Sequence, residues 1–180
     1  AGCCALKRRK RPISQRALKS HMRKLLKYSV GFFALLVVVA AVLFFGFAAD
    51  YAARSLNPVI ARGPYNISER AQKLHARLFV ADMHADSLLW GRDILLDSAD
   101  AQVDLPKLER GNVALQGFTI VTKTPRGMNI DENTGETDSI WLLAAAQRQP
   151  IENLSSLAKR ALYQAARLHE SADRSGGRLM

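Results

Sequence analysis

The longest apolar run of the chain extends from Val30 to Ala49 and contains no charged residue. As an α-helix, its twenty residues would cover about 30 Å, which is the thickness of the hydrocarbon layer of a bilayer. A helix that is apolar on all sides either lies in a core or spans a membrane. Because a core helix of this length rarely lacks polar side chains altogether, the pattern predicts a transmembrane helix over residues 30–49.

The segment that follows, residues 50–65, contains two helix-breaking pairs, Asn57-Pro58 and Gly63-Pro64. We interpret it as a linker next to the membrane. Residues 66–180 switch between helical and strand-like periodicity and predict an α/β region. The predicted elements are a helix over 67–77 capped by Asn66 or Ser68, a strand over 78–83, a loop or short helix over 87–96, a helical turn over 103–109, a strand over 113–122, a polar loop over 123–137, and helices over 138–147 and 151–172.

The last predicted helix has an apolar stripe with the i, i+3, i+4 spacing of one helix face. Its members are Leu154, Leu157, Ala158, Ala161, Leu162, Ala165 and Leu168. We expect this stripe to pack against the sheet. His169 at the end of this helix, and His75 on the helix over 67–77, are interpreted as surface residues.

Charge is distributed unevenly along the chain. Residues 1–29 carry ten of the 26 Lys and Arg residues and no acidic residue, whereas residues 30–180 are balanced. A basic segment directly before an apolar run is typical of the cytoplasmic side of a membrane anchor. The segment also lacks the interleaved aromatic residues of a nucleic-acid-binding tail, so we expect no nucleic-acid partner. We therefore predict a cytoplasmic tail over 1–29 and export of everything after Asp50.

A cleaved signal peptide is the competing interpretation of the apolar run, since Gly46-Phe47-Ala48 resembles a cleavage site. Signal peptides, however, usually have apolar cores of about 7–15 residues, so we expect an uncleaved anchor. Met22 precedes a short basic segment and is our hypothesis for the natural start. The only cysteines, Cys3 and Cys4, precede the span, so the exported residues cannot form an internal disulfide.

An alternating acid–histidine–acid motif follows the first predicted strand. Because alternate side chains share a face of a strand, Asp82, His84 and Asp86 would point in the same direction. An imidazole and a carboxylate two residues apart can bind one metal ion, and zinc accepts both. By itself, this spacing also suits a solvated loop or a histidine that is hydrogen-bonded to its neighbour.

The segments Val80–Trp90 (VADMHADSLLW) and Val103–Gln116 (VDLPKLERGNVALQ) together resemble the start of the membrane dipeptidase family of metallopeptidases. That family opens with a D-x-H-x-D strand, continues with V-D-L-P-(R/K)-L, and then has a Gly-x-Val-x-x-Gln strand. The resemblance covers about residues 67–177. The chain departs from the pattern at Gln102, where the family often has histidine.

The resemblance implies a TIM-type (β/α)₈ barrel, of which residues 66–180 would be the N-terminal part with two strands. It also implies a site with two zinc ions, in which His84 and Asp86 would bind one ion, while Asp82 would orient a ligand or only cap the strand. In the family, a bridging glutamate and two histidines come from later strands, and no residue after His84 matches them.

We therefore expect the N-terminal fragment of a membrane-anchored zinc dipeptidase, which acts on dipeptides outside the cytoplasm and is inactive as this chain. Its partners would be the dipeptide substrate and the lipid bilayer. The alternative is a non-catalytic single-pass membrane protein whose exported α/β domain binds a partner.

Overall fold

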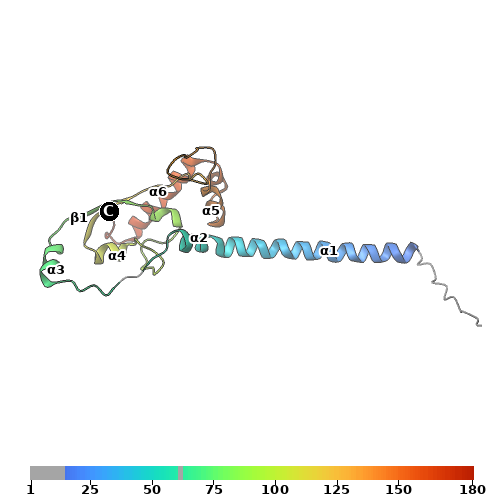
Figure 1. Cartoon of the computed structure of the whole chain (residues 1–180), viewed down its shortest axis with the longest axis horizontal. Helices are drawn as coiled ribbons and strands as arrows, with labels where there is room; N and C mark the ends of the chain where they lie inside the picture. The colour runs from blue at the N-terminus through green and yellow to red at the C-terminus, as the bar shows by residue number, and fades with distance from the viewer. Residues whose placement is uncertain (1–14, 61–62) are drawn as a thin grey trace, which may run out of the picture. The chain divides into compact units, whose positions relative to one another are not determined.

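The computed structural model describes residues 15–60 and 63–180 (Figure 1). Cys3, Cys4 and five of the ten basic residues before Val30 lie outside these residues. The chain divides into two compact units, Ala1–Val42 and Leu43–Met180, and each is described by itself.

The first unit is represented by a helix, α1 (Gln15–Leu43), which continues through a π-helical turn, η1 (Phe44–Ala48), into α2 (Ala49–Leu56). Among the described residues, one helix, His21–Leu56, is long and apolar enough to cross a membrane. The predicted end of this helix was wrong. The helix runs seven residues into the expected linker, because none of residues 50–56 breaks a helix, and it ends at Asn57, where the following proline disfavours helical backbone.

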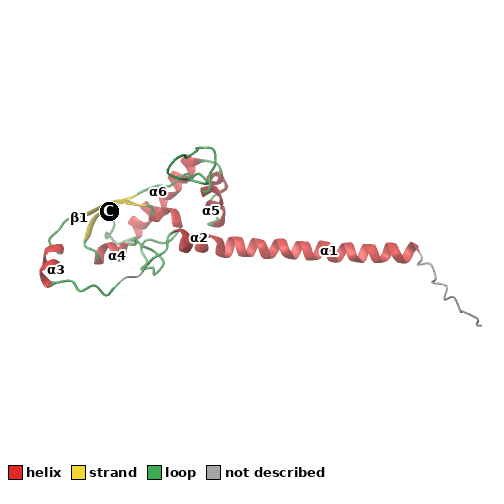
Figure 2. Ribbon diagram, viewed as in Figure 1, coloured by secondary structure: helices red, strands yellow, loops and turns green. Residues whose placement is uncertain are grey.

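The sheet consists of two parallel strands, β1 (Val80–Ala85) and β2 (Val113–Phe118) (Figure 2). Asp82 on β1 is in register with Gln116 on β2. The first strand begins and ends two residues later than predicted, so His84 lies within the strand. The second strand stops at Phe118, four residues earlier than predicted.

The connection from β1 to β2 contains a 3₁₀ turn, η2 (Ser87–Trp90), and the helix α4 (Leu105–Arg110). Asp104 caps α4, because its carboxylate accepts hydrogen bonds from the main-chain N–H groups of Lys107 at 3.0 Å and Ser98 at 3.2 Å. The Lys107 ammonium pairs with the same buried carboxylate. The predicted helical turn over 103–109 is thus confirmed, and Asp104 is the reason it begins where it does.

Helix α3 (Glu69–His75) is capped by the Ser68 hydroxyl, which accepts from the N–H of Ala71 at 3.3 Å. This agrees with one of the two predicted caps. The helix is shorter than the predicted 67–77, and none of its residues is buried.

After a long loop come α5 (Ile140–Ala146), a 3₁₀ turn η3 (Ile151–Leu154) and α6 (Leu157–Arg174). The single helix predicted over 151–172 is therefore broken, because Ser156 adopts extended backbone and its hydroxyl caps α6 by accepting from Lys159 N. The expected orientation of α6 was also wrong. Its buried residues are Arg160, Gln164 and Ser171, whereas Leu157 and Leu162 of the apolar stripe are exposed.

Arg160 explains why a polar face of α6 is buried. Its side chain is 1% exposed, and its guanidinium donates to four groups on three segments. The acceptors are the main-chain oxygens of Asn153 (2.5 Å), Leu154 (2.7 Å) and Thr122 (2.7 Å) and the carboxylate of Asp138 (2.6 Å). A buried cation is tolerated when its donors are satisfied in this way. The arginine therefore holds η3, the segment after β2 and the loop before α5 against α6.

Gln164 makes a second bridge from α6 to the segment after β2. Its side-chain amide donates to Val121 O at 2.9 Å and accepts from Val121 N at 3.3 Å. The amide thus makes the two hydrogen bonds to Val121 that a neighbouring strand would otherwise make. This pairing satisfies the backbone of residues that the sequence pattern had assigned to the strand itself.

Residues 63–180 form an α/β fold with a small parallel sheet and helices. Two large apolar side chains of the sheet are exposed, Met83 at 72% and Leu115 at 44%, and so is Phe79, which directly precedes β1. Within the described residues the sheet has two strands, so it does not form a closed barrel.

Candidate functional site

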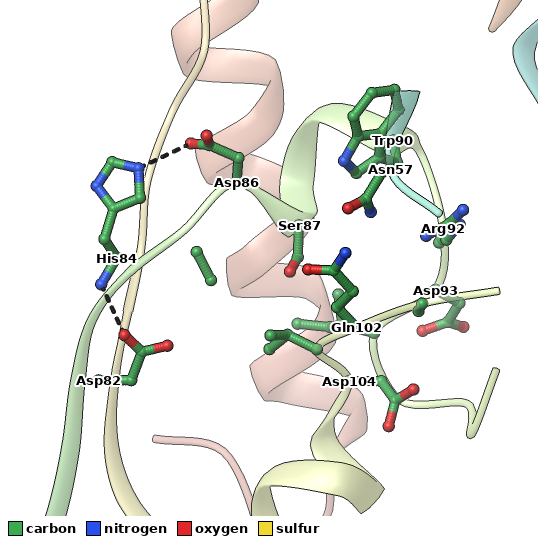
Figure 3. A pocket seen from close by; sticks show the side chains of 14 residues that line it. Asn57, Asp82, His84, Asp86, Ser87, Trp90, Arg92, Asp93, Gln102 and Asp104 are labelled. Carbon is green, nitrogen blue, oxygen red and sulfur yellow. Dashed lines mark hydrogen bonds and ion pairs between the residues drawn. The ribbon is translucent and has the colours of Figure 1, made fainter. Parts of the chain in front are cut away.

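A cavity of about 350 Å³ lies beside the carboxyl end of β1. One wall is the strand end with Asp82, His84 and Asp86, and the other is formed by the connection to β2 (Figure 3). Ligand sites of α/β folds usually occur where parallel strands end. The size falls within the range of small-molecule sites.

The three residues of the alternating motif all line this cavity, as their spacing predicts. The His84 imidazole Nε2 lies 3.5 Å from Asp86 Oδ1, and the two side chains are 70% and 45% exposed. Figure 3 shows the imidazole turned toward the Asp86 carboxylate. The two groups are thus close enough to contact one ion, and both are open to solvent.

Asp82 is held by local hydrogen bonds. Its Oδ1 accepts from the main-chain N–H of His84 at 3.2 Å. The amide side chain of Gln116 and this N–H together lower the pKa of the Asp82 carboxyl below its ordinary value. The hydrogen bond from His84 N–H lets Asp82 fix the backbone from which His84 projects. This contact agrees with both roles that the sequence left open, orienting a ligand residue and capping the strand.

Thr119 is a member of the site that the sequence analysis missed. Its hydroxyl donates to Asp86 Oδ1 at 2.5 Å, and its main-chain N–H donates to Ala85 O at 3.0 Å. Thr119 follows β2 directly, as Asp86 follows β1. The sequence pattern gave no signal for this position, because it extended the second strand to residue 122. Thr119 lies beside Asp86 because the strand ends at Phe118 and the carboxyl ends of parallel strands meet at one edge of the sheet.

Gly117 brings the two strand ends together. A Cβ at this position would lie 2.5 Å from the main-chain oxygen of Met83. A glycine inside a strand often marks such a close approach of two backbones. The pairing that places Asp86 beside Thr119 therefore requires glycine here.

The opposite wall of the cavity is also acidic. It includes Asp93 and Asp104, together with Gln102, whose amide donates to Pro58 O at 3.1 Å. The hydrogen bond from Arg174, with a second from Leu95 N, lowers the pKa of Asp93. Arg92 lines the cavity as well, and burial lowers the pKa of its guanidinium.

A zinc ion fits the donor types of this site but not their number. Imidazole nitrogen and carboxylate oxygen are ordinary zinc ligands, and protein zinc sites use three or four of them. Among residues 15–60 and 63–180, no cluster of three or more His, Cys, Asp and Glu side chains has the arrangement of a metal site. His84 and Asp86 would therefore supply only two of the ligands that a zinc site needs.

The other histidines of residues 63–180 do not contribute to the cavity. His75 ends α3, His169 lies near the end of α6, and both are exposed, as the sequence predicted. The acidic residues of the loop over 123–137, which are Asp131, Glu132 and Glu136, are exposed too. Their exposure agrees with the polar loop predicted over 123–137.

Comparison of the chain with models of protein families, with curated proteins and with solved structures found no match.

Proposed function

We propose that this chain contributes the first metal-binding strand of a membrane-anchored zinc dipeptidase. The observation that carries the proposal is the cavity at the end of β1, where His84 and Asp86 lie side by side and open to solvent. The resemblance of the two quoted segments to the membrane dipeptidase family supports the same assignment. For the complete fold we accordingly propose a TIM-type barrel whose first two strands are β1 and β2.

The residues of the chain have separate roles in this proposal. His84 and Asp86 would bind one of two zinc ions, and Thr119 would orient the Asp86 carboxylate through its hydroxyl. Asp82 would hold the backbone of His84 in place. Zinc in such sites lowers the pKa of a bound water and polarises the carbonyl of the substrate. The remaining ligands would come from outside the described residues.

The apolar helix would anchor the protein in the membrane, with the basic residues before Val30 in the cytoplasm. The α/β region would then act on dipeptides outside the cytoplasm. A reporter that is active only after export, fused after Pro64, tests this orientation. We expect activity from this reporter and none from a cytoplasmic reporter at the same point, and the reverse result would contradict the orientation.

Dipeptide hydrolysis by the natural gene product that carries this sequence tests the enzymatic proposal. The 180-residue chain should be inactive, because two ligands do not complete a zinc site. In an active gene product, His84→Ala and Asp86→Ala should nearly abolish turnover and leave thermal melting almost unchanged. His75→Ala, which removes an exposed histidine outside the cavity, is the matched control. Full turnover by the His84→Ala protein at normal zinc content would refute the site.

The second candidate is a non-catalytic membrane protein whose exported domain binds a partner. The observation in its favour is the exposed sheet face with Met83 and Leu115. The two proposals differ in the activity assay, since a partner-binding domain would leave dipeptides intact in every form of the protein.

A further inference from the structure

The end of the apolar helix forms one wall of a second cavity, within the unit Leu43–Met180. This cavity has a volume of about 350 Å³ and lies between the helix and α5. The helix contributes one side chain per turn, and α5 contributes the facing residues. The principal lining residues are Phe44, Ala48, Ala52 and Leu56 from the helix and Leu142 and Leu143 from α5. The cavity is thus an apolar groove that continues the surface of the predicted transmembrane segment.

Helix α5 has the composition of a segment in contact with lipid. Its sequence is IWLLAAA, without a charged or hydrogen-bonding side chain except the indole of Trp141. Ile140, Ala144 and Ala146 are buried, whereas Trp141 and Leu142 are 40% and 44% exposed. Tryptophan is enriched where a membrane meets water, because its ring is apolar and its N–H is polar.

A basic residue, Arg148, follows α5 and contacts the end of the apolar helix. Arg148 is exposed, and its Nη2 donates to the main-chain oxygen of Phe45 at 2.7 Å. The guanidinium has five N–H donors in all, so further donors remain for a phosphate group. An arginine beside an apolar helix end is the arrangement expected at the level of lipid headgroups.

The depth of these contacts follows from helix geometry. If residues 30–49 fill the hydrocarbon layer, Phe44 lies about 7.5 Å inside its boundary, at 1.5 Å per residue. Because α5 packs against η1 and α2, it would lie at a similar level (Figure 1). Interfacial helices bury their apolar side about 5–10 Å deep, which agrees with this position.

We propose that α5 is a second membrane contact, which lies in the interface of the bilayer with Trp141 and Leu142 among the acyl chains and with Arg148 just inside the hydrocarbon boundary, from where its remaining N–H donors reach toward the phosphates. The groove between α5 and the anchor would hold part of a phospholipid acyl chain. This inference rests on the anchoring proposed above. Its consequence is that the α/β region would be held against the membrane surface at two points.

Quenching of tryptophan fluorescence by brominated lipid tests the proposal. The full chain is placed in vesicles of phosphatidylcholine and phosphatidylglycerol, with and without bromine on the acyl chains. In the Trp90→Phe chain, Trp141 is the only tryptophan. We expect brominated lipid to quench its fluorescence by at least about half, and we expect water-soluble acrylamide to quench it weakly. Trp141 would then lie at the depth that interfacial helices reach.

A matched control places the single tryptophan elsewhere on the exported unit. The chain with Trp90→Phe, Trp141→Phe and Phe79→Trp carries it at an exposed position before β1. Brominated lipid should leave this tryptophan nearly unquenched. Equal quenching at both positions would show general adhesion to the vesicle and would overturn the proposal, as would a Trp141 protected from both quenchers, which indicates a protein contact instead.

Alkaline carbonate extraction separates this inference from the anchoring on which it rests. A chain released by carbonate is not anchored, and that result overturns both proposals. A chain retained by the membrane whose Trp141 is quenched by acrylamide and not by brominated lipid overturns the interfacial helix alone.

Discussion

The hydroxyl of Thr119 donates to Asp86 Oδ1 at 2.5 Å, and the same carboxylate oxygen lies 3.5 Å from His84 Nε2. One oxygen of Asp86 therefore links the ends of both strands to the histidine of the candidate site. Thr119 fixes this carboxylate in a position where it can share an ion with the imidazole.

Replacement of Thr119 tests this positioning role. Thr119→Val removes the hydroxyl and keeps the shape, so zinc affinity of the complete site in the natural gene product should fall by about 10–100-fold, as for other groups that orient a ligand. Thr119→Ser keeps the hydroxyl and should retain most of the affinity. Competition with a chromophoric chelator measures both. Equal zinc affinity of the Val and Ser proteins would show that Thr119 does not orient Asp86.

Gly117→Ala should weaken the sheet next to the site. The added Cβ would lie 2.5 Å from Met83 O, so the strands must separate, at a cost of about 1–3 kcal/mol. Amide hydrogen exchange in β1 measures the effect as faster exchange near Ala85. Gly135→Ala is the matched control, since nothing lies within 4 Å of the Cβ added there. Unchanged protection of β1 in the Gly117→Ala chain would contradict the close approach.

Arg160→Met should loosen α6 from the rest of the α/β region. The substitution leaves the Asp138 carboxylate and three main-chain oxygens without their donor, and losing one partner of a buried ion pair costs about 3–5 kcal/mol. Exchange of the amides of α6 and of residues 119–124 should accelerate accordingly. The neighbouring Lys159→Met substitution, at an exposed position, should have little effect. Equal exchange rates in the two variants would show that Arg160 does not hold α6 in place.

Asp93 should titrate below its ordinary value of 3.8, because the hydrogen bond from Arg174 favours its charged form. A carboxyl whose pKa is lower in the folded state stabilises the fold at pH values above its unfolded pKa. This contribution is lost as the pH falls through the lower, folded pKa. Carbon-detected NMR of the Asp93 carboxyl measures the midpoint, which should rise toward 3.8 in Arg174→Gln. The Glu170→Gln chain should show little change. An Asp93 midpoint that stays the same in the Arg174→Gln chain would contradict the pairing of these two residues.

The sequence predicted those parts of the fold that depend on local pattern. The apolar run identified the helix, Ser68 is one of the two predicted caps, and the alternation of Asp82, His84 and Asp86 predicted a shared face for these side chains, all of which line one cavity. These features require only the residues themselves and their near neighbours along the chain.

The features that the sequence did not predict depend on contacts between distant residues. The apolar stripe of α6 suggested that its apolar face is buried. The buried face is polar instead, because Arg160 donates to four acceptors and Gln164 pairs with the backbone of Val121. Thr119 belongs to the site only because β1 and β2 are paired in parallel. Hydrophobic periodicity carries no information on either contact.

Zinc titration of the untagged 180-residue chain, followed by NMR of the histidine side chains, tests the central claim most directly. The account predicts weak binding, because two protein ligands leave the remaining positions to water. Zinc should shift the Nε2 signal of His84 and leave those of His75 and His169 nearly unchanged. Asp86→Asn should weaken this response by about tenfold, whereas His75→Ala should not affect it. A zinc response centred on His75 or His169, or one at His84 that persists unchanged in the Asp86→Asn chain, would contradict the assignment of His84 and Asp86 as joint ligands.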